Sequence, residues 1–428
     1  MMDIFEILNY KLSEAKKFYF FDYFYVLLKS TQKFDDEERV FQNFQYLKEA
    51  LNLGESRYKK IGSISDKITN KQLTRYKYTF QEVVEESQLL GIIHLENGKK
   101  IKLTELGNNL LSKYENSNPE SFIEQLFFLI ESKSYGFHYL ISSLYKENPT
   151  NGGTLIFPIY SPLKLHFSKE DLLKNNKFIE YLNTLKTQLE LDINNHLKKQ
   201  INLHSANEDL IDRLVEIGLL TKEYDLINND DYNLVLKRIR DYWLNHFLKN
   251  VYNFKLITSV SYFDLWTYRA KQIGLLNVTE FYPGVSGKMV YPTSILYGQI
   301  KAPEFRKLFE YPNEENLYLH DPKFNENFVS TLFESYLELK RSYSSYFVNL
   351  ADLREIVCFK LKISYRKFVT HLDKAYELNL QGRLSISISL EADKLPSENA
   401  IYLKRDPIYI LNKLKNIIAI ELNTTRNE

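Results

Sequence analysis

Hydrophobic residues recur at helical spacing just before a pair of short β-type runs, in the stretch between Ser261 and Ser294. Because these apolar positions are three or four residues apart, they share one face of a predicted amphipathic helix. They are Phe263, Trp266, Ala270 and Ile273. Gly274 suits the left-handed residue that follows a helix. Alternation over residues 277–282 and the glycine-containing link 284–287 then predict a hairpin.

A similar order of helix, glycine, strand, turn and strand occurs between residues 79 and 105. The apolar pattern predicts a helix at 79–90 with one buried side. That side consists of Phe80, Val83, Val84, Ser87 and Leu90. Two alternating runs, 92–95 and 101–104, flank Asn97-Gly98, which is a strong hairpin signal. A new helix is predicted from Glu105.

The last part of the chain repeats this pattern from about Asn349. One helix face carries Leu353, Ile356, Val357 and Leu361. Ser364 is placed to cap a second helix, whose inward positions are Phe368, Leu372, Ala375 and Tyr376. Gly382 ends that helix, and residues 383–390 alternate as a strand. Residues 400–403 and 417–420 are two further strand predictions.

The remaining segments are mostly predicted helices. Residues 1–50 form two, and their aromatic run 18–25 is either a packed core or a nucleic-acid stacking platform. Residues 119–150 are helical, and 154–162 is an edge strand because its prolines exclude a central one. A polar helical connector is predicted at 168–200. Ile-Gly-Leu-Leu occurs at both 217–220 and 273–276, which hints at reused architecture, and a helix is predicted at 324–342.

Composition narrows the class of protein. The 428 residues are 44% hydrophobic and 26% charged, with only 14 glycines and 11 prolines, which favours a helix-rich globular chain. A net charge of +1 requires any nucleic-acid site to be a local patch. The single cysteine, Cys358, excludes an internal disulfide and lies in an apolar run that predicts burial. With no long apolar segment and no signal-peptide pattern, we expect a cytoplasmic protein without a membrane partner.

Positive charge is concentrated in one stretch and one turn. Between Arg57 and Thr79 the basic residues are interleaved with tyrosines, and Asp66 is the only acid. Such a mixture suits phosphate contacts. The predicted DNA-binding residues are Arg57, Lys59, Lys60, Lys67, Lys71, Arg75 and Lys77, together with Lys99, Lys100 and Lys102 at the hairpin. A solvated turn is the alternative for the three hairpin lysines.

Residues 90–107 resemble the winged helix-turn-helix proteins of bacterial DNA-associated systems. The resemblance rests on Leu90-Gly91-Ile92-Ile93 and on Leu103-Thr104-Glu105-Leu106-Gly107, and it covers about 35 residues with the preceding helix. It implies a mainly α fold with small β-hairpins and several winged-helix-like modules joined by helical connectors. The expected divisions are 1–118, 119–204, 205–312 and 313–428.

The central and last modules have no cationic turn like the one that carries Lys99, Lys100 and Lys102. The central hairpin has large aromatics around an uncharged tip, so Trp266, Tyr282 and Tyr291 are predicted to lie in an interface with another domain or a partner. In the last module, Arg366, Lys367, Lys374 and Arg383 contact phosphates or serve packing alone.

Motifs for catalysis are missing from the sequence. Gly284–Met289 is too short for a phosphate-binding loop, and neither a nucleophile elbow nor a His-Glu-x-x-His motif occurs. Glu391-Ala392-Asp393-Lys394 departs from the acid-any-Lys spacing of nuclease cores, which favours a solvated turn. We therefore expect no cofactor, no metal and no enzymatic activity.

The predicted function is nonenzymatic DNA binding within a larger bacterial assembly. Antiviral defence, a mobile element or chromosome maintenance would each use such a subunit, and a protein partner or homo-oligomer is expected. The principal alternative is an adaptor that binds proteins, as in the accessory subunits of chromosome-organising ATPases. A divergent metal-dependent nuclease is the third hypothesis.

Overall fold

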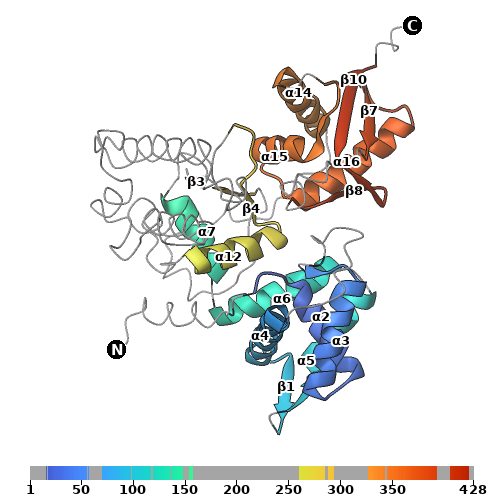
Figure 1. Cartoon of the computed structure of the whole chain (residues 1–428). Helices are drawn as coiled ribbons and strands as arrows, with labels where there is room; N and C mark the ends of the chain where they lie inside the picture. The colour runs from blue at the N-terminus through green and yellow to red at the C-terminus, as the bar shows by residue number, and fades with distance from the viewer. Residues whose placement is uncertain are drawn as a thin grey trace, which may run out of the picture.

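The computed structural model describes somewhat more than half of the chain. The described residues are 16, 18–54, 56, 70–97, 99–116, 119–134, 136–147, 154–157, 260–284, 288–293, 326–342, 345–392 and 405–423. They form mostly helices, with small antiparallel sheets of two or three strands (Figure 1). The predicted fold class is confirmed at this level.

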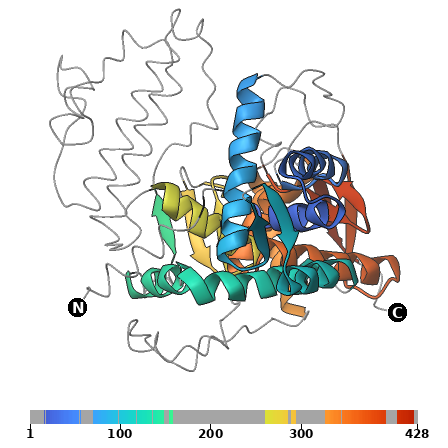
Figure 2. The same ribbon diagram turned by 90° about the horizontal axis from the view of Figure 1, so that it is seen from below.

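The described residues of the first module form four helices and one hairpin. In chain order these are α2 (Asp22–Lys33), α3 (Glu37–Ala50), α4 (Asn70–Leu89), β1 (Ile93–Glu96), β2 (Lys100–Leu103) and α5 (Glu105–Asn116). β1 pairs with β2, and an isolated bridge joins Asp36, just before α3, to Lys100 on β2. β2 therefore lies between β1 and the chain that enters α3. Figure 2 shows α4 standing upright across the helices that follow it.

The central unit combines helices with a three-stranded sheet. α6 (Pro119–Ser134) and α7 (Gly136–Glu147) precede β3 (Leu155–Phe157), α12 (Val260–Gln272), β4 (Leu276–Thr279) and β5 (Lys288–Pro292). The strand order is β3-β5-β4, so β3 is at an edge of this sheet, as predicted. Gly136 lets α7 approach α12, because an added Cβ would lie 2.5 Å from the Trp266 ring.

The C-terminal module repeats the element order of the first. Its elements are α14 (Glu326–Ser342), β6 (Val348–Asn349), α15 (Leu350–Leu361), α16 (Tyr365–Leu380), β7 (Ile386–Glu391), β8 (Ile408–Ile410), β9 (Lys413–Lys415) and β10 (Ile417–Leu422). β10 lies between β6 and β7, just as β2 lies between the Asp36 bridge and β1. Helix, short strand, two helices and a final strand pair therefore occur in both modules.

Two hydrophobic clusters hold these elements together. The first extends from Phe18 to Val290, so α2, α4, α6, α7, α12 and the central sheet share one core. The second extends from Phe328 to Ile420, with Tyr282 packed against it. In Figure 1, α12 and β4 lie between the first module and the C-terminal module. Phe18, Phe21 and Phe24 are buried, which confirms the core interpretation of the aromatic run.

Two local predictions are wrong, and one hairpin was not predicted. The helix predicted at 79–90 begins at Asn70, nine residues earlier, so part of the basic stretch is helical. β4 and β5 are buried along their whole length instead of alternating, because both faces of this sheet are covered. The hairpin of β8 and β9 was not predicted. The predicted elements at 168–200, 217–220 and 400–403 lie outside the described residues.

Candidate nucleic-acid interface

The hairpin of the first module holds its three lysines in a fixed position. Lys99 and Lys100 are exposed, and Lys102 is partly exposed. The N–H of Ile101 donates to the Asp35 carbonyl at 2.8 Å, and the N–H of Glu37 donates to the Lys99 carbonyl at 3.1 Å. These bonds attach the hairpin to the start of α3, so the lysines are carried by a defined backbone.

The Leu-Thr-Glu-x-Gly run has a physical explanation in this module. The Thr104 hydroxyl donates to the Gly91 carbonyl at 2.8 Å and accepts from the N–H of Gly107 at 3.1 Å. An added Cβ at Gly107 would lie 2.1 Å from the Ile92 carbonyl oxygen. Threonine therefore caps α5, and glycine lets α5 pack against the start of β1.

α4 presents polar residues on the side opposite its apolar face. Phe80, Val83 and Ser87 face the core, as predicted. Arg75, Lys77 and Tyr78 are exposed in the half of the helix nearer its N-terminus. All basic residues of α4 lie in this first half, and the second half exposes the acidic Glu85.

The structure describes some of the predicted DNA-binding cations and not others. Arg75, Lys77, Lys99, Lys100 and Lys102 lie on α4 or the hairpin, which follow one another in the chain. Lys71 is the second residue of α4. Arg57, Lys59, Lys60 and Lys67 lie outside the described residues.

Carboxylates accompany three of these lysines. Lys77 lies 3.5 Å from Glu38, Lys100 lies 3.2 Å from Asp35, and Lys102 lies 2.7 Å from Glu96. The hydrogen bond from Lys100 lowers the pKa of Asp35, and the one from Lys102 lowers the pKa of Glu96. All of these side chains reach solvent, and ion pairs between such side chains are weak. The three pairs therefore contribute little to stability.

A buried ion pair attaches α4 to the central helix α12. The Arg269 guanidinium is fully buried and donates to both carboxylate oxygens of Glu86, at 2.8 and 2.7 Å. It also donates to the Phe18 carbonyl at 3.3 and 3.2 Å and to the Lys16 carbonyl at 3.2 Å. Arg269 is thus a structural residue that fixes α4 against the core.

Neither Arg269 nor Glu86 was predicted from the sequence to form an ion pair. A signal was present in both helices. Glu86 lies between the buried positions Val84 and Ser87, and Arg269 precedes the buried Ala270. Two opposite charges on the apolar sides of two helices are the pattern expected of a buried pair.

The central hairpin contacts the C-terminal module through its aromatic residues. Tyr291 and Tyr282 pack against the Phe359 ring with centroids 5.2 and 5.4 Å away. The Asn277 amide donates to the Ile363 carbonyl at 2.7 Å. Trp266, by contrast, lies inside the first cluster against Phe137, with ring centroids 5.0 Å apart. We call the contacts of Asn277, Tyr282 and Tyr291 with the C-terminal module the junction.

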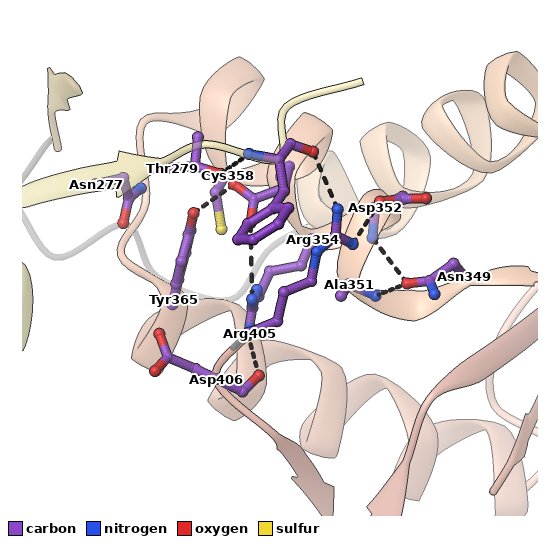
Figure 3. A network of polar contacts seen from close by, with 12 residues as sticks. Asn277, Thr279, Asn349, Ala351, Asp352, Arg354, Cys358, Tyr365, Arg405 and Asp406 are labelled. Carbon is purple, nitrogen blue, oxygen red and sulfur yellow. Dashed lines mark hydrogen bonds and ion pairs between the residues drawn. The ribbon is translucent and has the colours of Figure 1, made fainter. Parts of the chain in front are cut away.

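Charged side chains lie near the junction, and Figure 3 shows Asp352, Arg354, Arg405 and Asp406 among them. Lys271 lies 2.8 Å from the Asp406 carboxylate and 4.7 Å from the centroid of the Tyr365 ring. Arg405 binds the Asp352 carboxylate and donates to the Phe281 carbonyl at 3.2 Å. These pairs join α12 and the end of the central hairpin to the C-terminal module.

Beneath them lies a buried group of ionisable residues. The Tyr365 hydroxyl donates to Glu355, and the Arg354 guanidinium lies 4.2 Å from the Tyr365 ring centroid and donates to the Asp406 carbonyl at 2.9 Å. Burial raises the pKa of Tyr365 and of the Cys358 thiol well above their ordinary values. A protonated, buried thiol is a poor nucleophile, so this arrangement suits packing and not catalysis.

The cations of the C-terminal module are less concentrated. Arg366, Lys374 and Arg383 are exposed and Lys367 is half-buried, while Lys374 lies 3.6 Å from Glu377. Glu391 is exposed at the end of β7, and Asp393 lies outside the described residues. Within the described ranges, no three His, Cys, Asp or Glu side chains are close enough to hold a metal ion.

Comparison with protein families, curated proteins and solved structures found no match to this chain. In the part of the chain that the structure describes, no helix combines the length and apolar character needed to cross a membrane.

Proposed function

We propose that this chain is a nonenzymatic DNA-binding subunit of a larger bacterial assembly, and that α4 and the β1–β2 hairpin contact the duplex. The observation that carries the proposal is the set of exposed or partly exposed cations on these two consecutive elements, Arg75, Lys77, Lys99, Lys100 and Lys102. Lysine and arginine side chains at a fixed hairpin and on one helix supply the phosphate contacts that dominate affinity for DNA.

The element order supports the same proposal. Helix, short strand, two helices and a strand pair is the order of winged helix-turn-helix modules, which place the third helix and the hairpin against DNA. In this chain α4 is the third helix, and the buried Arg269–Glu86 pair fixes it to the core. A rigidly held helix loses little conformational freedom on binding, which favours affinity.

Charge reversal of the hairpin tests the proposal. The variant Lys99→Glu, Lys100→Glu and Lys102→Glu should bind duplex DNA at least tenfold more weakly at 0.1 M salt. The slope of log affinity against log salt should become flatter by roughly two to three, because about three fewer counterions are released. Fluorescence anisotropy with a labelled duplex over a salt series measures both quantities.

A matched control reverses the same amount of charge elsewhere. Lys113, Lys133 and Lys413 are exposed on α5, α6 and β9, so their replacement by Glu changes the net charge equally. This control should keep most of the affinity and the salt slope. Equal losses in both variants would mean that only net charge matters, and unchanged binding in the hairpin variant would contradict the assignment. The second result would favour the protein-binding adaptor, to which the three ion-paired lysines are also suited.

A further inference from the structure

The half of α4 nearer its N-terminus leaves most of its side chains open to solvent. Phe80 is the first buried side chain among those described in this helix. The exposed side chains that precede it are Leu73, Thr74, Arg75, Lys77 and Tyr78. A helix about 10–12 Å in diameter fits the major groove of B-DNA, which is about 12 Å wide. This half of α4 is therefore open on the sides that a groove would enclose.

Helical geometry arranges these side chains as a polar stripe with a cation on each flank. At about 100° per residue, Tyr78 and Gln81 lie within about 60° of each other, opposite the buried face. Both side chains are exposed. Arg75 and Lys77 lie about 160° apart, one on each side of this stripe. A helix in a groove has base edges in front of it and a phosphate backbone on either side, so it needs side chains in this order.

Gln81 carries the donor and the acceptor that adenine requires. Its side-chain amide has an N–H₂ group and a carbonyl oxygen. In the major groove, adenine presents the N7 acceptor beside the N6 amine, and a glutamine can bond to both at once. This pair of groups is arranged differently on the other three bases. Gln81 is therefore suited to select adenine.

Tyr78 is restricted to one hydrogen-bonding role by its neighbour on the next turn. Its hydroxyl forms a hydrogen bond with Glu82, which raises the pKa of Tyr78. A carboxylate only accepts, so the hydroxyl donates to Glu82 and keeps its oxygen as an acceptor. In the major groove the donors are the amines of adenine and cytosine. Tyr78 is therefore suited to a base that presents an amine.

An ion pair ends the stripe one turn beyond Gln81. Glu85 follows on the same side of α4, and its carboxylate lies 2.7 Å from the Lys16 ammonium. Without Lys16, the Glu85 charge would repel nearby phosphates. The pair carries no net charge, so the acid does not oppose a duplex that lies along the first half of the helix.

We propose that α4 reads DNA sequence, with Gln81 contacting an adenine and Tyr78 contacting the amine of a neighbouring adenine or cytosine in the major groove. Arg75 and Lys77 contact phosphates on the two sides of that groove. This inference rests on the proposed DNA binding and adds to it the residues that select the bases.

Selection from a random duplex library tests this readout with the full-length protein. Sequencing of the bound fraction should show an enriched motif with a fixed adenine. Changing that adenine in the selected duplex should weaken binding by about five- to hundredfold. Gln81→Ala should remove this preference and leave the salt slope unchanged, because no phosphate contact is lost. Fluorescence anisotropy over a salt series measures the affinities.

Three further variants separate base readout from charge. Tyr78→Phe keeps the ring, removes the hydroxyl and should relax the preference at one neighbouring base. Lys77→Ala should weaken binding to all sequences alike and reduce the salt slope by about one. Gln88→Ala is the matched control, because it removes another exposed glutamine of α4 that lies beyond Glu85. It should change neither the affinity nor the motif.

The possible outcomes distinguish this inference from the proposed function. Binding of duplex DNA without an enriched motif would overturn the readout and leave the proposed function in place. A motif that neither Gln81→Ala nor Tyr78→Phe alters, or one that Gln88→Ala alters equally, would also overturn it. Failure to bind any duplex would contradict both and would favour a protein partner for α4.

Discussion

At the scale of single residues, Arg269 and Glu86 form the most consequential pair in the described structure. The guanidinium has no exposed surface and the carboxylate very little, so each charge depends on the other for solvation. Bidentate geometry, the carbonyls of Phe18 and Lys16, and the Phe18 ring at 4.9 Å compensate the cost of burial. Such a pair is specific in geometry even where its net stabilisation is small.

Arg269→Met should destabilise the protein by about 3–5 kcal/mol, because it leaves the Glu86 carboxylate buried without a partner. Glu86→Gln should have a similar effect on the guanidinium. The double variant Arg269→Met with Glu86→Met should lose less than the sum of the two single changes. Urea denaturation of the four proteins gives the coupling free energy.

The ion pair of Lys16 with Glu85 is a matched control, because Glu85 precedes Glu86 on α4. Their charged atoms are 2.7 Å apart, but both side chains reach solvent. Lys16→Met should cost less than about 1 kcal/mol, since water solvates the remaining carboxylate. A loss at Arg269 as small as this one would show that Glu86 is not confined as the structure indicates.

At the scale of elements, the β8–β9 hairpin has an unusual turn. Ile410 pairs with Lys413, so Leu411 and Asn412 form a two-residue turn, and both have positive φ, at 47° and 62°. Asn-Gly is preferred in such turns because residues with a branched or bulky side chain are strained there. The Leu411 N–H donates to the Asp373 carboxylate at 2.9 Å, which ties the strained turn to α16.

Replacing Leu411 with Asn and Asn412 with Gly should stabilise the C-terminal module by about 0.5–1 kcal/mol. The strain is relieved, and little packing is lost because Leu411 is exposed. The N–H to Asp373 remains. Thermal unfolding monitored by circular dichroism measures the change. Destabilisation would show that the Leu411 side chain makes contacts that outweigh the backbone strain.

This turn also explains one limit of prediction from sequence. The β1–β2 hairpin was predicted because Asn97-Gly98 is a strong local signal, whereas Leu411-Asn412 carries no comparable signal and needs Asp373 to hold it. Helix ends at Ser364, Gly274 and Gly382 were predicted because their causes lie within a few residues. The start of α4 was placed too late, because its first turns lack the apolar positions on which the prediction relied.

Only part of the candidate interface could be predicted from the sequence. The position of Lys99, Lys100 and Lys102 at the hairpin followed from its sequence pattern. The pairing of Lys100 with Asp35 did not, because the two residues are far apart in sequence and meet only through the fold. The Arg269–Glu86 pair spans 183 positions for the same reason. Long-range electrostatic partners are set by tertiary packing, which a local pattern does not contain.

At the scale of the whole molecule, two hydrophobic clusters meet at the junction. The first cluster includes α4 and α12, and the second includes α15 and α16. The described contacts between them include those of Asn277, Tyr282 and Tyr291 and the Lys271–Asp406 pair. Tyr291 is fully buried, although it lies at the boundary of the two clusters. The junction therefore determines whether the clusters unfold together.

The last prediction concerns this coupling. Tyr291→Ala should cost about 3–5 kcal/mol, as expected for truncating a buried aromatic side chain. Asn277→Ala removes the hydrogen bond to Ile363 and should cost about 1–3 kcal/mol more. In the double variant, hydrogen exchange should show α16 opening at lower denaturant than α4, whereas in the unchanged protein both should open together. Tyr409→Ala, an exposed aromatic on β8, is the matched control and should leave the two transitions coincident. If α4 and α16 still exchange together in the double variant, cooperativity passes through contacts other than the junction.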